Sequence, residues 1–370
     1  MKFLHLSDLH LGRRLYDVSL LEDQQEILQQ ILELLDTRGA DAVLLAGDIY
    51  DKPVPSAEAV RLLDWFLTQL ADRNKPVFMV SGNHDSAERI AFGAKLLDGR
   101  GVYVSPVLEQ ITAPVTLTDA YGPVHIYLLP FVKPIHVRRL FPEQEIGDYT
   151  EAIQRVIEAW SPDETERNIL VAHQFVTGAE RSESETVSVG GLDDVSGAVF
   201  APFDYVALGH LHREQFVLRE TVRYCGTPLS YSFSEEEGKS VTWVELGEKG
   251  NVTIETTPLQ PIHPVRTVKG TFEELLKDTS EDYLRIILQD EDDIPYAMPR
   301  LHHRYPNLLR LEYDNLRTRT QMQLEPLETM ELSPMQMLED FYRSRNNQPM
   351  AEPLRELAKA WMEEIWEDEP

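Results

Sequence analysis

The chain has 370 residues, 42% of them hydrophobic and 26% charged, a composition ordinary for a soluble globular protein of two or three domains. Its net charge of −28 argues against holding nucleic acid through the overall electrostatic field, so such a role would need local basic loops, bound metal ions or a basic partner. The single cysteine, Cys225, excludes an internal disulfide framework, and no apolar run approaches the roughly 20 residues of a membrane span.

The first predicted element is a strand at residues 3–6 that leads into two potential ligands, Asp8 and His10. These residues lie two positions apart, so both side chains can point the same way from an extended segment. Met1 precedes the strand without a basic and apolar leader, and with one cysteine in the chain we expect a cytoplasmic protein.

A helix and a second strand follow. Ser19 and Glu22 have the spacing of a capping box, which predicts that a helix begins there. The apolar residues 43–46 predict a strand buried on both faces, which ends on Gly47 and presents Asp48. Because ligands collect beyond the carboxyl ends of strands in α/β sheets, Asp48 lies where chemistry is expected.

The alternation of helix and strand then repeats along the chain. Further predicted strands are residues 76–81, followed by Gly82-Asn83-His84-Asp85; residues 125–129; residues 169–172, followed by His173; and residues 205–208, followed by Gly209-His210-Leu211-His212. Helices alternating with strands at this spacing indicate βαβ units and therefore parallel strands.

A break in composition divides the chain. Three prolines lie within residues 258–264, so we assign residues 1–257 to a first domain. Short strands and helices alternate in residues 258–314, which predicts a small α+β domain. A polar linker, residues 315–332, then leads to two helices within residues 333–370.

The two C-terminal helices are predicted from their starts and their apolar stripes. Ser333-Pro334 has the features of a helix start, and Pro353 opens the second helix. The stripe of the second helix consists of Leu354, Leu357, Ala358, Trp361 and Ile365. The helices either fold back on the protein's own surface or offer this face to another chain, and the polar linker favours the second alternative.

Aspartate, asparagine and histidine stand at the ends of five strands that we expect in one sheet: Asp8, His10, Asp48, Asn83, His84, His173, His210 and His212. Taken singly, Asp8 could cap a turn and His173 could be a satisfied core histidine. Taken together, ligand-type residues at five strand ends favour a metal site. Oxygen and nitrogen ligands suit manganese, iron or zinc-like ions, and their number suits two ions ~3.5–4 Å apart that activate a water and neutralise a phosphate.

These motifs, Asp8-Leu9-His10, Gly47-Asp48, Gly82-Asn83-His84-Asp85, His173 and Gly209-His210-Leu211-His212, resemble the five signature motifs of the calcineurin-like metallophosphoesterases. The resemblance implies an α/β fold: a layered β-sandwich flanked by helices, with a small α+β cap domain and C-terminal helices. Gly226-Thr227-Pro228 and Ser232-Phe233-Ser234-Glu235 add a closer resemblance to the bacterial nuclease subunits of this family. Those subunits act on DNA together with a coiled-coil ATPase.

The resemblance also implies a role for each residue. One ion would be held by Asp8, His10 and His212, the other by Asn83, His173 and His210, with Asp48 bridging the two. His84 would contact the scissile phosphate or protonate the leaving oxygen, steadied by Asp85, and a histidine can supply a proton near neutral pH. Archaeal and eukaryotic relatives tend to carry a histidine where this chain has Asp51, which either orients a neighbouring side chain or only forms a turn.

Candidate substrate contacts are Arg13, Arg14, Arg89 and Arg213, each of which follows a ligand motif and would offset the acidic surface locally. Each could equally be a surface arginine with a local ion pair. Helices expected at residues 56–70 and 86–97 flank the metal loops, and relatives form two-fold dimers through this region. Their apolar side chains would serve equally as core.

Three functions compete on this sequence. The first is a manganese-dependent DNA exonuclease and endonuclease subunit, a homodimer within a heterotetramer with a coiled-coil ATPase and with no membrane partner. The second is a stand-alone phosphodiesterase or phosphatase that acts on a small molecule, which needs neither the second domain nor the tail helices. The third is a regulatory scaffold, against which the full ligand set with His84 argues. The first function accounts for the ligand set, the second domain and the tail helices together.

Overall fold

The computed structural model describes residues 1–105, 107–180, 194–235, 238–292 and 294–315, together with residues 335, 338–339, 341–343 and 349–358. Residues 1–288 and 294–312 form one compact unit, and residues 289–293 and 313–370 form a second. The predicted helix start at Ser333-Pro334 and the stripe residues Trp361 and Ile365 lie outside the described residues.

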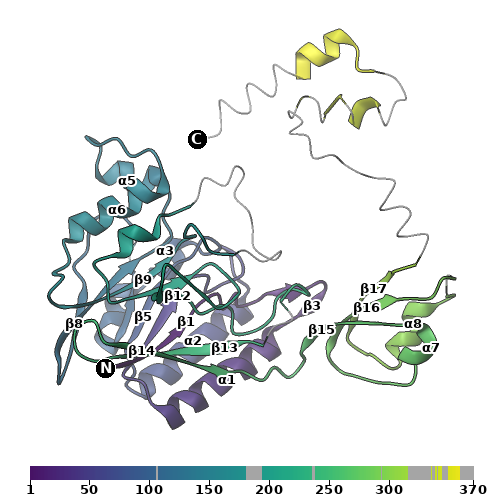
Figure 1. Ribbon diagram of the computed structural model, residues 1–370, viewed down its shortest axis with the longest axis horizontal. Helices are drawn as coiled ribbons and strands as arrows, with labels where there is room; N and C mark the ends of the chain where they lie inside the picture. Colours follow the sequence, from purple (N-terminus) through teal and green to yellow (C-terminus); the bar gives the residue numbers. More distant parts are fainter. Residues whose placement is uncertain are drawn as a thin grey trace. The chain divides into compact units, whose positions relative to one another are not determined.

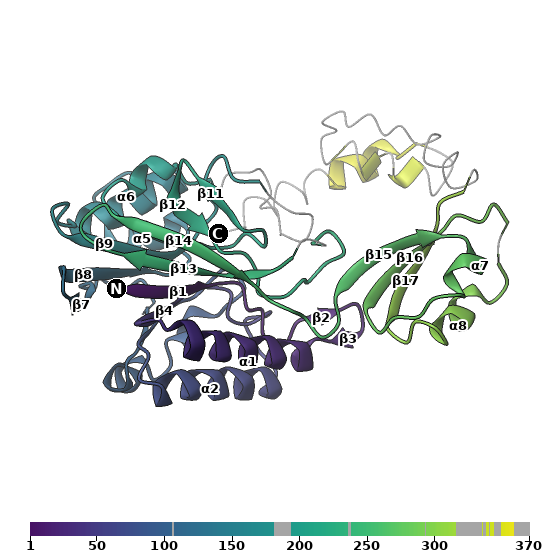
Figure 2. The ribbon, with the colours of Figure 1, turned by 60° about the horizontal axis from the view of Figure 1, so that its bottom comes forward.

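Two six-stranded sheets face each other in the larger unit (Figures 1 and 2). The first has the order β14-β13-β1-β4-β5-β6, with β1 Lys2–Leu6, β4 Ala42–Ala46, β5 Val77–Val80, β6 Val102–Val104, β13 Ser240–Leu246 and β14 Val252–Pro258. The second has the order β11-β12-β10-β9-β8-β7, with β7 Val115–Asp119, β8 Gly122–Leu129, β9 Arg167–His173, β10 Tyr205–Gly209, β11 Gln215–Val217 and β12 Arg219–Tyr224. The predicted parallel strands form the centre of each sheet: β1, β4 and β5 in the first, and β8, β9 and β10 in the second.

Both faces of each central strand are buried. In β4, Leu44 and Ala46 belong to the core between the two sheets, whereas Val43 and Leu45 belong to the core beneath the helices. Because successive side chains of a strand point to opposite faces, a strand covered on both sides has an unbroken apolar sequence. This explains why residues 43–46 gave a strand signal without alternation.

Helices cover the outer face of each sheet (Figure 2). Over the first sheet lie α1 Leu21–Arg38 and α2 Ala57–Asp72, and over the second lie α5 Pro134–Leu140 and α6 Tyr149–Trp160. The predicted α/β fold class, a layered β-sandwich flanked by helices, is confirmed. The sequence reading missed α6, although Asp148 caps it and Ile153, Val156 and Ile157 are buried at helical spacing.

Two local predictions are wrong. Ser19 does not cap α1: it lies in β3 (Val18–Ser19), which pairs with β2 (Arg14–Leu15), and Leu20 takes the capping position without a side-chain bond. The helix expected at residues 86–97 is two short helices, α3 Ala87–Ile90 and α4 Ala94–Leu97. Gly93, with a φ of 74°, separates them because this left-handed backbone conformation ends a helix. The described residues also form two 3₁₀ turns, η1 Asp98–Arg100 and η2 Gly197–Phe200.

The small α+β part has a three-stranded sheet of order β15-β16-β17. Its elements are β15 Val265–Gly270, α7 Phe272–Leu275, β16 Tyr283–Leu288, α8 Ala297–His302 and β17 Leu308–Tyr313. The part is tied to α1 through buried Asp23, whose carboxylate accepts the Tyr283 hydroxyl at 2.8 Å and lies 2.9 Å from Nδ1 of His263.

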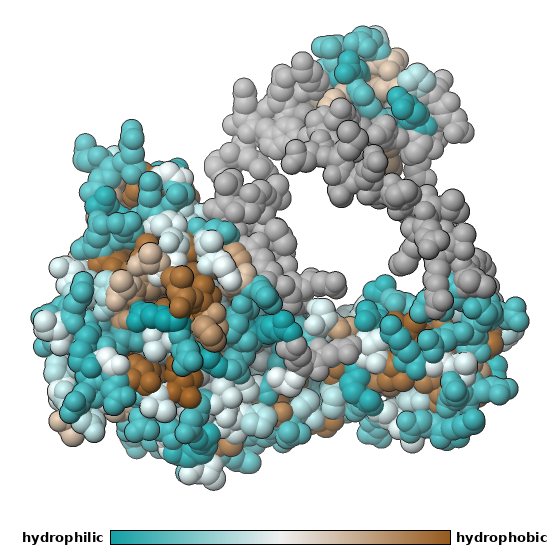
Figure 3. All heavy atoms as spheres, viewed as in Figure 1, coloured by the Kyte–Doolittle hydropathy of each residue, from teal (hydrophilic) through white to brown (hydrophobic). Residues whose placement is uncertain are grey.

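Most of the surface in view is hydrophilic, with apolar side chains gathered at a few places (Figure 3). Across the described part of the chain, no helix combines the length and the apolar character needed to cross a bilayer. In the smaller unit, residues 352–358 are helical, and Arg355 forms an ion pair with Glu339.

Candidate metal centre

The predicted ligands follow strands of both sheets. Strands β1, β4 and β5 of the first sheet lead to Asp8, His10, Asp48 and Asn83, and strands β9 and β10 of the second lead to His173, His210 and His212. The expectation that all five strands belong to one sheet is therefore wrong. The ligand loops converge because the two sheets pack face to face. Where they meet, Nδ1 of His173 at the end of β9 lies 2.8 Å from the backbone oxygen of Ala46 at the end of β4.

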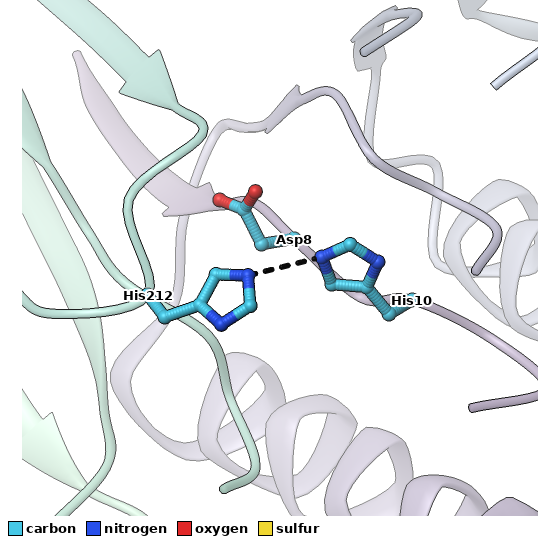
Figure 4. A group of neighbouring side chains, drawn as sticks. All are labelled: Asp8, His10 and His212. Carbon is cyan, nitrogen blue, oxygen red and sulfur yellow. Dashed lines mark hydrogen bonds between the residues drawn. The ribbon is translucent and has the colours of Figure 1, made fainter. Parts of the chain in front are cut away.

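One group of side chains consists of Asp8, His10 and His212, which are buried and whose ligand atoms all lie within 4.8 Å of one another (Figure 4). The Nε2 atoms of the two histidines face each other at 3.2 Å. His212 is separated from the other two by some two hundred residues of sequence, so only the packing of the sheets brings this group together.

A second group consists of Asp8, Asp48 and His173, again buried and within 4.8 Å of one another. Oδ2 of Asp48 lies 3.4 Å from Nε2 of His173 and 3.7 Å from Nε2 of His10. Asp48 belongs to the second group, and its carboxylate also lies close to His10 of the first. Asp8 belongs to both groups, whereas the sequence analysis assigned it to one ion only.

Asn83 and His210 complete the cluster. Oδ1 of Asn83 lies 2.9 Å from Nε2 of His173 and 3.1 Å from Nδ1 of His210. The backbone N–H of His210 donates to both carboxylate oxygens of Asp8, each at 3.1 Å. All seven predicted metal ligands therefore lie in one cluster at the ends of the strands, in which Asn83 is half-buried and the other six are buried.

The loops that carry the ligands hold unusual backbone conformations. Asp8, His10, Asp48 and His210 have φ values of 51°, 42°, 47° and 110°. Non-glycine residues rarely adopt positive φ, at a cost of about 1–3 kcal/mol each, and such residues concentrate at functional sites.

Two glycines of the motifs are required by close approach. A Cβ at Gly82 would lie 2.1 Å from Oδ1 of Asp48, and a Cβ at Gly209 would lie 1.9 Å from the backbone oxygen of Ala46. No side chain fits at either place, so Gly82 allows the loops after β4 and β5 to meet within the first sheet, and Gly209 allows the second sheet to approach the first.

The cluster concentrates buried charge. Burial raises the pKa of Asp8 to about 6, and the neighbouring Asp48 carboxylate adds to the effect. Burial also acts to raise the pKa of Asp48, but the adjacent His173 outweighs it and holds that pKa below its usual range. Burial lowers the pKa of His10 well below its usual value. Burial acts to lower the pKa of His173, but the adjacent Asp48 carboxylate outweighs it and raises that pKa to about 9. Two buried carboxylates among imidazole nitrogens form a donor set that fits two divalent cations.

His84 lies at the edge of the cluster, half-buried, with its ring centroid 4.9 Å from that of His10. Its backbone N–H donates to Oδ1 of Asp48 at 2.9 Å, and its Nδ1 lies 3.2 Å from the backbone oxygen of Asp51. Asp85 instead braces the loops: its carboxylate accepts the N–H groups of Ile49, Tyr50 and Gly82 at 2.9–3.0 Å. The ring of His84 is therefore supported by the backbone oxygen of Asp51 and not by the Asp85 carboxylate.

The four candidate arginines lie in different surroundings. Arg13 is half-buried and donates to the Asp51 carboxylate at 2.7 Å, close to His84. Arg213 is exposed and lies 3.6 Å from Glu180. Arg14 is exposed and donates to the backbone oxygen of Asp17, and Arg89 is exposed on α3.

Gln24, which the sequence reading did not single out, braces the loop of Asp8 and His10. Its Nε2 donates to the backbone oxygens of Leu9 at 3.1 Å and His10 at 2.8 Å, and its Oε1 accepts the N–H of Gly12 at 3.0 Å. A signal was present, since Gln24 falls on the apolar face of α1, where a buried amide needs partners.

Comparison with known proteins identifies the relatives of this chain. Residues 1–214 match the family model described as calcineurin-like phosphoesterase, and residues 261–346 match one described as the type 5 capsule protein repressor C-terminal domain. The SbcD subunit of the nuclease SbcCD from Staphylococcus saprophyticus is 32% identical over 93% of each chain, and its counterpart from Staphylococcus epidermidis is 31% identical over 95% of each chain. The solved structure of a dimetal phosphatase from Danio rerio, 13% identical with a TM-score of 0.43, covers 70% of this chain and 99% of its own.

Proposed function

Since the chain belongs to the calcineurin-like phosphoesterases and, within them, to the SbcD nuclease subunits, we propose that it is the manganese-dependent DNA exonuclease and endonuclease subunit of an SbcC–SbcD-type complex for DNA end processing and repair. The chain is a metal-dependent phosphodiesterase. The observation that carries the proposal is the buried cluster of Asp8, Asp48 and the histidines, with half-buried His84 at its edge. A cytoplasmic location belongs to the same proposal.

The proposed chemistry divides the work among these residues. Asp8, His10 and His212 would hold one ion, and Asn83, His173 and His210 would hold the other, with Asp48 between them. Bound ions of this kind activate a water as nucleophile and offset the charge of the phosphate. His84 contributes a proton to the leaving oxygen, and the backbone of Asp51 orients its ring.

Cleavage assays on two substrates test the function. We expect the purified chain with Mn²⁺ to cut DNA ends faster than a small phosphodiester, and the preference to increase when a coiled-coil ATPase of the SbcC type is added. Hydrolysis of the small phosphodiester alone would indicate a stand-alone phosphodiesterase. If the chain hydrolysed neither substrate but still bound the ATPase, it would be a regulatory scaffold.

We propose that DNA phosphates are contacted by individual arginines beside the metal centre. A cavity of about 640 Å³ adjoins His212, and its lining includes three basic residues, Arg213, Lys239 and Arg285, and three acidic ones, Glu180, Glu214 and Glu235. Arg285 comes from β16 of the small α+β part and lies over the Phe233 ring at 5.5 Å. Arg213 and Arg285 would contact DNA phosphates there, and Arg13, Arg14 and Arg89 would extend the contact.

We propose that the chain forms a homodimer within a heterotetramer. Phe92, between α3 and α4, is 85% exposed, and Leu96 on α4 is 82% exposed. Changing both residues to aspartate should convert a dimer into a monomer in sedimentation at micromolar concentration, because charges would replace apolar side chains that we place at the contact. The control is Tyr296→Asp, since Tyr296 is 82% exposed in the small α+β part. A wild-type monomer would contradict the proposal.

We propose that the tail helices bind the coiled-coil ATPase. Leu354 and Leu357 of the apolar stripe are 40% and 43% exposed, and Phe341, which precedes this helix, is 59% exposed. Deleting residues 333–370 should abolish capture of the ATPase while metal binding persists, and Leu354→Asp with Leu357→Asp should weaken capture strongly. The control is Glu356→Ala on the same helix. Capture of the truncated chain at full efficiency, with lowered thermal stability, would show instead that the helices fold back on the enzyme.

A further inference from the structure

The ring of His212 has a polar partner on the side away from Asp8 and His10. Its Nδ1 lies 2.9 Å from Oε1 of Glu235, whereas its Nε2 faces Nε2 of His10 at 3.2 Å. Glu235 is a buried carboxylate with only 6% of its surface exposed. The two nitrogens of the His212 imidazole therefore have different partners: Nε2 faces the ligand cluster, and Nδ1 contacts the buried Glu235 carboxylate.

The other carboxylate oxygen of Glu235, Oε2, accepts hydrogen bonds that fix the side chain in place. Oε2 accepts the Lys239 ammonium at 2.7 Å and the Thr227 hydroxyl at 3.3 Å. Lys239 also donates to the backbone oxygen of His212 at 3.0 Å and to the Thr227 hydroxyl at 2.7 Å. An ionised carboxylate only accepts hydrogen bonds, so Nδ1 of His212 carries the proton and the lone pair of Nε2 points into the ligand cluster.

Two other histidines of the cluster, His173 and His10, are supported differently. Nδ1 of His173 lies 2.8 Å from a neutral acceptor, the backbone oxygen of Ala46. Nδ1 of His10 is buried and has no hydrogen-bond partner within the described residues. Of these three rings, only that of His212 contacts a glutamate.

We propose that Glu235, anchored by Lys239, is a positioning residue that fixes the tautomer of His212, makes its Nε2 more basic and thereby sets the cation affinity of the Asp8–His10–His212 group. A carboxylate behind a metal-binding histidine orients the ring and strengthens its bond to the metal, and loss of such a partner typically weakens metal affinity about 10–100-fold. The inference rests on the metal centre of the proposed function and does not depend on the DNA substrate.

Titration of the metal-free full-length chain with Mn²⁺, followed by calorimetry, tests this role. The wild-type chain should bind two ions, and Glu235→Gln should weaken one of the two sites about 10–100-fold while leaving the other unchanged. Glutamine keeps the size and an oxygen acceptor but loses the charge, so the variant should fold. Glu235→Ala should weaken the same site at least as much.

The control is Glu214→Gln, which makes the same chemical change on a carboxylate that pairs with Arg223 and accepts the Ser240 hydroxyl at 2.6 Å. It should bind both ions as the wild type does. Normal binding of both ions by Glu235→Gln, or equal weakening of both sites, would overturn the proposal, since the second result is what general damage to the loop produces. A wild type that binds two ions but cuts no DNA would overturn the nuclease function and leave this inference standing.

Discussion

Replacing Asp48 with asparagine should abolish two-metal occupancy and reduce DNA cleavage about a thousandfold or more. The Asp48 carboxylate lies 3.4 Å from His173 of its own group and 3.7 Å from His10 of the other group, so its charge acts on both sites at once. Removing a shared carboxylate withdraws several kcal/mol of electrostatic stabilisation from the bound cations, and each 1.4 kcal/mol is about tenfold in rate. Calorimetry with Mn²⁺ and a cleavage assay on the same preparation measure both effects.

The fold should survive this change. Asparagine has the shape of aspartate, and its oxygen can still accept the backbone N–H of His84, which Oδ1 of Asp48 accepts at 2.9 Å. The control is Asp36→Asn, the same substitution at an exposed residue of α1 that pairs with Arg73. An Asp48→Asn chain that bound two ions and cut DNA at a near-normal rate would refute the bridging position of Asp48.

Replacing His84 with serine should reduce turnover by about two to four orders of magnitude, the usual loss when a general acid is removed, while both ions stay bound. The His84 ring is outside both groups of converging ligand atoms, and its Nδ1 contacts the backbone oxygen of Asp51. The contact of His84 with Asp48 comes from the backbone N–H, which serine keeps. The metal centre should therefore remain intact.

Single-turnover cleavage at saturating Mn²⁺, with calorimetric counting of bound ions, measures the two quantities separately. His302→Ser, on α8 of the small α+β part, is the matched control and should leave both unchanged. If His84→Ser lost an ion along with turnover, His84 would be a ligand and its role as a proton donor would have to be abandoned.

The sequence by itself determined which residues stand at the strand ends. Apolar runs such as residues 43–46 followed by a glycine and a polar residue are local patterns, readable because strands buried on both faces have unbroken apolar sequences. The elements of the small α+β part were predicted from another local pattern, since each is short and bounded by turn residues. Local pattern was misleading at Ser19, whose backbone pairs with Arg14, and at Gly93, whose φ of 74° breaks a predicted helix.

Only the tertiary structure decided how the ligands combine. The sequence could not show that they come from two sheets, that Asp8 lies in both groups, or that Gln24 and Glu235 brace them. Glu235 lies 23 residues from His212, and His212 lies 202 from His10, so no local period relates them. Such contacts depend on the face-to-face packing of the two sheets, where Gly209 approaches Ala46 too closely for any side chain. That packing turns a set of strand ends into one buried site.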